Sequence, residues 1–249
     1  MSGHSHFSSI KHKKAITDAK RGKIFSKIAR QISVAAKEKG GDINANPNLR
    51  LIIEKAKEFN MPKDNIERAI KKGTGELEGE KLEEIMYEAY GPGKIAIIII
   101  GITDNKNRAL AEIKQILSKN NGKLAGKGSV KWMFERKGVI TINEQQLLKP
   151  STDIKQEKEE KELQAIEAGA EDIYWDNNIL NIYTKPENLE IVKKNLINKG
   201  INIKSISLDW IAKQGKELEE KQKIAAEKLF EALDENDDVQ EIYSDIKLS

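Results

Sequence analysis

The residues best suited to chemistry are basic ones, and they gather in the first thirty positions of the chain. This stretch holds eight lysines and arginines, one acid (Asp18) and all three histidines. Four of the cations share one side of a helix, within an arc of roughly 80° at about 100° per residue: Lys20, Lys23, Lys27 and Arg30. The opposite side is apolar, which predicts that it packs and that the four cations face outward.

A row of cations without interleaved acids is typical of a surface that binds backbone phosphates. The alternative is an ordinary solvated helix face, although such faces usually alternate Glu with Lys. The candidate nucleic-acid-binding residues are Lys11, His12, Lys13, Lys14, Lys20, Arg21, Lys23, Lys27 and Arg30. We expect that reversing Lys20, Lys23, Lys27 and Arg30 to glutamate abolishes nucleic-acid binding and leaves the fold intact.

Other candidate sites are weaker. Gly91-Pro92-Gly93-Lys94 precedes a strand and has no Ser or Thr after the lysine, so it predicts a tight turn rather than a phosphate-binding loop. The acidic run 234–238 lacks the alternating ligands and the glycine of a calcium loop. It predicts a solvated turn, or an acidic surface that repels nucleic acid and orients the basic domain. His4 near a free N-terminal amine could chelate copper(II) or nickel(II) in vitro, but we expect no metal site, no cofactor and no catalytic triad.

Composition sets broad bounds on the protein class. The chain has 249 residues, 38% hydrophobic and 33% charged, with no cysteine, so disulfides and thiolate metal sites are excluded and a reducing, cytoplasmic setting is expected. No run reaches transmembrane length and no secretory signal is visible. Residues 1–77 contain 17 basic and 8 acidic residues, whereas the remainder contains 26 basic and 32 acidic ones. A basic module is therefore joined to an acidic body, which steers an anionic partner to one end.

Three helices are predicted to position the basic side chains. The first ends at Gly40–Gly41, a helix C-cap signal. Asn46 followed by Pro47 starts the second, as N-cap and first helical residue. After a break at 60–62, a short third helix ends at Lys71-Lys72-Gly73. Short connections between them predict a small bundle.

Beyond residue 78, strands and helices alternate. The continuous run Lys94–Ile100 is typical of a central strand that is buried on both sides. Further strands are predicted at 130–134, 138–142, 171–175, 179–184, 201–208 and 239–243. Helices are predicted between the cap at 103–105 and the stop at 120–122, and over about 155–168, 188–198 and 216–233.

These elements predict an α+β fold with three domains. An N-terminal three-helix domain (1–77) is followed by two ferredoxin-like α+β domains, the third (136–207) inserted in the second (78–135 plus 208–249). The insertion is the economical arrangement because a linear series of domains leaves the last strand without a sheet.

Several strings along the chain occur in the order of a known family. They are Gly3-His4-Ser5, 10–14, 18–25, 60–71, 87–93, 103–108, 134–138 and 233–240. By these strings the sequence resembles the YebC/PmpR family, to which the mitochondrial translational activator of cytochrome oxidase belongs. The resemblance implies a cytoplasmic, non-enzymatic protein of three domains in a pincer-like shape, usually labelled a probable transcriptional regulator. The family's basic motif matches Lys11, Lys13, Lys14, Lys20, Arg21 and Lys23. One departure is His6-Phe7, where the family commonly has Lys-Trp; Phe7 keeps a ring that can stack on a base.

Two functional hypotheses follow from the basic stretch and the resemblance. The first is a DNA-binding transcriptional regulatory protein. The alternative is a ribosome-associated translation factor that binds RNA and assists elongation through proline-rich stretches. Phosphate contacts carry no sequence information, so the basic residues do not separate them. A protein-interaction scaffold is a third class, and an enzyme is the least supported. The expected partners are promoter DNA or ribosomal RNA, with no membrane; the oligomeric state, monomer or weak dimer, stays open.

Overall fold

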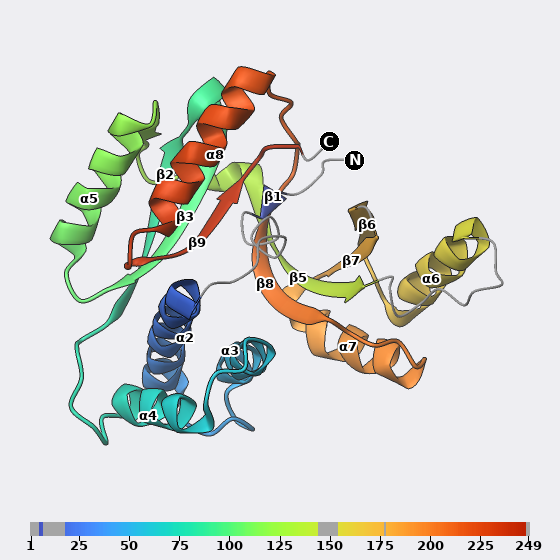
Figure 1. Ribbon diagram of the computed structural model, residues 1–249. Helices are drawn as coiled ribbons and strands as arrows, with labels where there is room; N and C mark the ends of the chain where they lie inside the picture. Colours follow the sequence, from blue (N-terminus) through green and yellow to red (C-terminus); the bar gives the residue numbers. More distant parts are fainter. Residues whose placement is uncertain (1–4, 7–17, 144–153, 177, 248–249) are drawn as a thin grey trace. The chain divides into compact units, whose positions relative to one another are not determined.

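The computed structural model describes residues 5–6, 18–143, 154–176 and 178–247 (Figure 1). The chain forms two compact units, one of residues 1–135 with 211–249 and one of residues 136–210. Both combine helices with antiparallel sheet, and the predicted α+β class with a helical N-terminal domain is confirmed.

Three helices open the first unit: α2 (Asp18–Lys39), α3 (Pro47–Glu58) and α4 (Lys63–Thr74). Their apolar faces form one core that includes Ile28, Ile32, Leu49, Ile53 and Ile66. The predicted cap is confirmed, because the Asn46 side chain accepts a hydrogen bond from the Leu49 N–H at 3.1 Å. Its amide also donates to the carbonyls of Ala35 and Gly40, which ties the end of α2 to the start of α3.

A glycine sets the close crossing of α2 and α4. A Cβ at Gly73 would lie 2.3 Å from the Ser33 carbonyl oxygen, so no larger residue fits there without a shift of backbone. Beside this contact the Ser33 hydroxyl donates to the Ala69 carbonyl at 2.8 Å. The C-cap is Gly75, in the left-handed region at φ 82°, two residues beyond the predicted stop.

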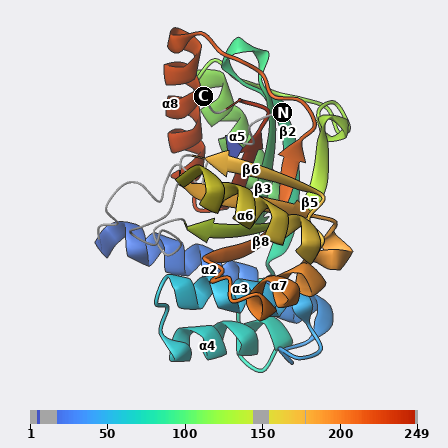
Figure 2. The same cartoon turned by 90° about the vertical axis from the view of Figure 1, so that its right-hand side faces the viewer.

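The sheet of the first unit combines strands from both sides of the inserted segment. Its order is β1 (Ser5–His6), β9 (Val239–Ser244), β3 (Ala96–Thr103), β2 (Glu83–Tyr90) and β4 (Lys123–Leu124). The helices α5 (Lys106–Lys119) and α8 (Glu220–Asp234) cover one face (Figure 2). Ile97 and Ile99 of β3 pack there against Leu117, Leu229 and the other apolar residues of the two helices. The predicted buried strand therefore forms the centre of this core.

The second unit alternates strand and helix in a split βαβ pattern. It contains β5 (Phe134–Asn143), α6 (Ile154–Ala168), β6 (Asp172–Asp176), β7 (Ile179–Thr184), α7 (Leu189–Asn198) and β8 (Ser205–Ala212), with β5 and β8 running to and from the first unit. A short 3₁₀ turn, η4 (Pro186–Asn188), precedes α7. The sheet order is β6-β7-β5-β8, the ferredoxin-like order expected from the sequence.

The structure differs from the prediction at several elements. Strand β2 has no counterpart in the prediction, because its burial does not alternate cleanly between the two faces. The strand predicted at 130–134 is instead the 3₁₀ turn η2 (Lys131–Met133) leading into β5, which runs without interruption to Asn143. β8 begins at Ser205 rather than at residue 201, because the Ile201 N–H bonds back to Leu196 at the end of α7. The predicted turn at Gly91-Pro92-Gly93 is confirmed as the 3₁₀ turn η1 (Pro92–Lys94).

Candidate nucleic-acid interface

The first predicted nucleic-acid-binding residues fall outside the part of the chain that the structure describes. This applies to Lys11, His12, Lys13 and Lys14, and also to Phe7. Lys20 belongs to the first turn of α2, and Arg21 follows it with an exposed side chain. The role of these residues in binding therefore stays a prediction.

The α2 ridge, defined here as Lys23, Lys27 and Arg30, lies against protein. All three side chains contact the acidic turn, defined as residues 234–238, which links α8 to β9 next to α2 (Figure 1). Helical periodicity correctly places the three cations on one side of α2. The prediction that this side faces outward is wrong, because the acidic turn covers it.

Two lysines of the ridge bind the C-terminal end of α8. The Lys27 ammonium donates to the Asp234 carbonyl oxygen at 2.8 Å and to its carboxylate at 3.0 Å. Lys23 donates to the Glu235 carbonyl and lies 3.6 Å from the Asp237 carboxylate. The last carbonyls of a helix have no partner within it and carry its partial negative charge. Lysines at this end satisfy those carbonyls, and Lys27 is buried there at 8% exposure.

Arg30 belongs to a network around the buried carboxylate of Asp238. Arg30 donates to one oxygen of Asp238 at 2.8 Å and to the Asp237 carbonyl at 3.0 Å. The other oxygen of Asp238 accepts from the Thr103 hydroxyl at 2.9 Å and from Arg108 at 3.0 Å. The hydrogen bond to Asp238 raises the pKa of Arg108 further above its usual value. Asp238 is thus held between two guanidinium groups, as a buried carboxylate requires.

The predicted solvated turn at residues 234–238 is correct only in part, because Glu235 and Asp237 are exposed and Asp238 is buried. Asp238 is 3% exposed, and its backbone approaches β3 at a bulge next to Gly101, where a Cβ would lie 2.8 Å from the Asp238 carbonyl oxygen. The Asn236 side chain accepts from the Asp238 N–H and donates to Glu112 of α5. The turn therefore has a defined conformation, and it contacts α2 directly.

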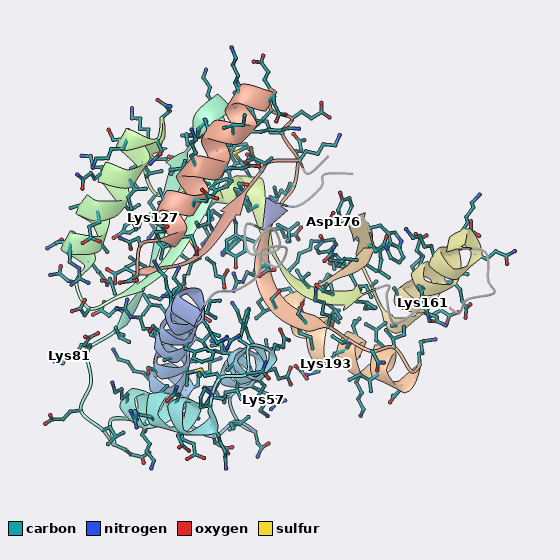
Figure 3. The ribbon with its side chains drawn as sticks, in the orientation of Figure 1. Lys57, Lys81, Lys127, Lys161, Asp176 and Lys193 are labelled. Atoms are coloured by element: carbon teal, nitrogen blue, oxygen red, sulfur yellow. The ribbon has the colours of Figure 1, made fainter. Side chains whose placement is uncertain are left out.

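Several other cations in the helical domain and just after it are exposed. Figure 3 labels Lys57 on α3 and Lys81 on the segment between α4 and β2, both with exposed side chains. On α4, Arg68, Lys71 and Lys72 are exposed over its last two turns. These cations are spread over several elements, unlike the compact α2 ridge.

The described residues contain no metal site and no membrane-spanning helix. Within the described ranges no three His, Asp or Glu side chains form a group able to hold a metal ion. Across those same ranges, no helix combines the length and the apolar character needed to cross a membrane.

Comparison with known proteins identifies relatives over the full length of the chain. Residues 5–76 match the family model described as the TACO1/YebC protein N-terminal domain, and residues 82–246 match that of the TACO1/YebC second and third domain. A protein of Halothermothrix orenii named "probable transcriptional regulatory protein" is 47% identical, covering 100% of this chain and 96% of its own. One with the same name from Fervidobacterium nodosum is 48% identical, covering 100% and 94%. The crystal structure of a conserved hypothetical protein from Aquifex aeolicus superposes with a TM-score of 0.84 at 42% identity, covering 96% of each chain.

Proposed function

Since the chain belongs to the TACO1/YebC family, we propose that it is a nucleic-acid-binding regulator of gene expression. The names of its relatives favour a DNA-binding regulator of transcription. The alternative is a ribosome-associated translation factor that binds RNA. We assign it no catalytic activity. The cytoplasm is the setting that suits such a regulator, and the cysteine-free composition accords with it.

The observation that carries the proposal is the charge at the start of the chain. Three of the eight cations in the first thirty residues hold the acidic turn, and five more precede them with one acid among them, Asp18. We assign phosphate binding to these five cations and to His12, which lies among them in the sequence. The proposed phosphate-binding residues are therefore Lys11, His12, Lys13, Lys14, Lys20 and Arg21. Phosphates neutralised by such cations release counterions, and this release drives binding.

The α2 ridge can contact nucleic acid only if the acidic turn moves away from it. Lys27 and Arg30 donate to buried or half-buried oxygens of the acidic turn, so these donors reach a phosphate only where the turn moves away. Reversal of Lys20, Lys23, Lys27 and Arg30 together is therefore an unsuitable test, because it removes Lys27 from Asp234 and one of the two guanidinium partners of Asp238. The expectation that such a variant keeps its fold conflicts with these contacts.

A neutralised N-terminal segment provides the direct test. Changing Lys11, Lys13 and Lys14 to glutamine should weaken binding to duplex DNA and lower the slope of log affinity against log salt by roughly 0.9 for each phosphate that the variant no longer neutralises. The matched control changes Lys57, Lys81 and Lys114 to glutamine, which removes equal charge from exposed positions on three other elements. Equal affinity and salt slope for wild type and the N-terminal variant would refute the assignment.

Crosslinking in cells, followed by sequencing of the bound DNA and RNA, separates the two functions. Enrichment of promoter DNA supports the transcriptional regulator. Enrichment of ribosomal RNA near the tRNA sites or the exit site overturns it in favour of the translation factor.

A further inference from the structure

A second cationic region lies between α5 and β5. The tryptophan loop, defined as residues 119–134, contains lysines at every fourth position and no acid: Lys119, Lys123, Lys127 and Lys131. All four lysine side chains are exposed, and Lys127 is labelled in Figure 3. The region stands out because the chain outside residues 1–77 carries more acids than bases.

A buried carboxylate fixes the conformation of the loop. Glu88 of β2 is 5% exposed, and its oxygens accept hydrogen bonds from the N–H groups of Gly128 at 2.5 Å, Val130 at 2.7 Å and Lys131 at 2.8 Å. Its own carbonyl accepts from the Ala125 N–H. Burial alone raises the pKa of the Glu88 carboxyl, but the three backbone donors and Lys131 outweigh it and hold that pKa below the usual range. The carboxylate therefore stays ionised and keeps the loop in one shape.

The ordered loop presents Trp132 to solvent. This side chain is 68% exposed, the highest value for a large apolar side chain among the residues the structure describes. Its indole N–H donates to the Ser129 carbonyl at 3.0 Å, and the hydroxyl of Tyr90, itself 38% exposed, donates to the same oxygen at 3.3 Å. Because the indole N–H is hydrogen-bonded within the loop, the part of Trp132 left for a partner is the apolar face of its ring.

The other two tryptophans are arranged differently. Trp175 is half-buried with the Lys158 ammonium 4.7 Å from its ring centroid, and Trp210 is half-buried with the Arg136 guanidinium at 5.5 Å. Both rings are thus covered in part by cations. Trp132 instead has an open ring, surrounded in sequence by lysines.

We propose that the tryptophan loop binds single-stranded nucleic acid, with the Trp132 ring stacked on an unpaired base and the lysines contacting the flanking phosphates. The inference rests on the proposed function, since it adds a second contact with the same class of partner. Aromatic rings beside a cationic track are how proteins bind single strands without reading sequence. Lys123 lies directly opposite Tyr90 in the β2–β4 ladder, so a cation stands beside the second exposed ring of the site.

The chemistry favours a single strand over a duplex or a protein partner. Bases in a duplex are stacked on each other and offer no free face to a ring. A protein interface built on one tryptophan requires surrounding apolar area to exclude water. The other exposed residues of this loop are instead its four lysines, Asn121, Gly126 and Gly128. Unpaired bases occur in RNA and in opened DNA, and both have the chemistry that the site requires.

The test compares Trp132→Ala with wild type in binding to a short single-stranded RNA, to a single-stranded DNA of the same sequence, and to the corresponding duplex. Stacking of one base predicts a loss of roughly tenfold to a hundredfold in single-strand affinity. Duplex affinity and the salt slope should stay unchanged, because no cation is removed. Trp132→Phe should recover part of the lost single-strand affinity. Trp210→Phe, at a half-buried tryptophan, should leave the affinity for RNA, single-stranded DNA and duplex unchanged.

The outcomes separate this inference from the proposed function. If wild type binds no nucleic acid of any kind, the proposed function fails and the inference fails with it. If wild type binds single strands and Trp132→Ala binds them equally well, the inference alone is overturned. A loss confined to RNA assigns the site to RNA, and an equal loss for both single strands assigns it to any unpaired base. Circular dichroism of Trp132→Ala should match wild type, because the exposed ring contributes little to the core.

Discussion

The α2 ridge and the tryptophan loop both carry cations at helical spacing, yet the first lies against the protein and the second faces solvent. The ridge meets an acidic turn that lies about two hundred positions later in the chain, as the separation of 207 between Lys27 and Asp234 shows. In the tryptophan loop the buried acid is Glu88, whose oxygens accept hydrogen bonds from backbone N–H groups, and the four lysine side chains are exposed. A run of cations in sequence therefore indicates a binding surface only when no acid from a distant segment reaches it.

Charge reversal at one position in each region should give the largest difference in stability between the two regions. Arg30→Glu places a carboxylate against Asp238, which is buried, and removes a charge-assisted bond at 2.8 Å. We expect the free energy of unfolding to fall by about 3 kcal/mol or more. Lys127→Glu, at an exposed loop position, should change it by less than about 0.5 kcal/mol. Urea denaturation measures both, and similar losses for the two variants would contradict the division between the regions.

Sequence patterns predicted the local features of the ridge but not its surroundings. The 100° periodicity correctly groups Lys23, Lys27 and Arg30, and the Asn46 cap and the buried run at Ile97–Ile99 are also confirmed. The partner of the ridge could not be predicted, because the contact depends on how α8 and β9 pack beside α2. The acidic run 234–238 was visible in the sequence, but its charge alone favours solvent as strongly as it favours a cationic partner.

The tryptophan loop shows a different limit of sequence reasoning. Val130 and Phe134 are buried and Trp132 is exposed, which reproduces the alternation of a strand. The backbone does not form one there, because the N–H groups of Val130 and Lys131 bind Glu88 instead of a neighbouring strand. Glu88 lies in β2, which the sequence did not predict, so its role had no visible signal.

Removal of the loop's carboxylate should have the next largest effect. In Glu88→Gln an amide NH₂ faces backbone donors, and at least one N–H of the loop loses its acceptor. Hydrogen bonds to charged groups contribute about 1.5–3 kcal/mol, so we expect a loss of about 2 kcal/mol. Hydrogen exchange at Gly128, Val130 and Lys131 should quicken. Glu83→Gln, an exposed position on the same strand that pairs with Lys106, is the matched control and should cost at most about 1 kcal/mol.

The pH dependence of the Glu88 contribution is a smaller effect with a definite sign. The pKa of Glu88 is lower in the folded protein than its usual value of about 4.3. Its contribution is therefore complete above about pH 5 and is lost as the pH falls through the lowered folded pKa. The difference in unfolding free energy between wild type and Glu88→Gln should stay constant from pH 5 to pH 8 and shrink below about pH 4. A constant difference at every pH would contradict the ionised contact.

Lys23→Ala should give the smallest change and the sharpest test of the ridge. Lys23 is the least enclosed member, with its side chain 31% exposed and its acidic partner Asp237 79% exposed, so we expect a stability loss of no more than about 1 kcal/mol that high salt reduces. Because this variant keeps its fold, its nucleic-acid affinity can be read directly. An unchanged salt slope means that Lys23 acts only on the acidic turn. A salt slope lowered by roughly 0.9 means that the Lys23 ammonium contacts a phosphate. The acidic turn then moves away from Lys23 when nucleic acid binds.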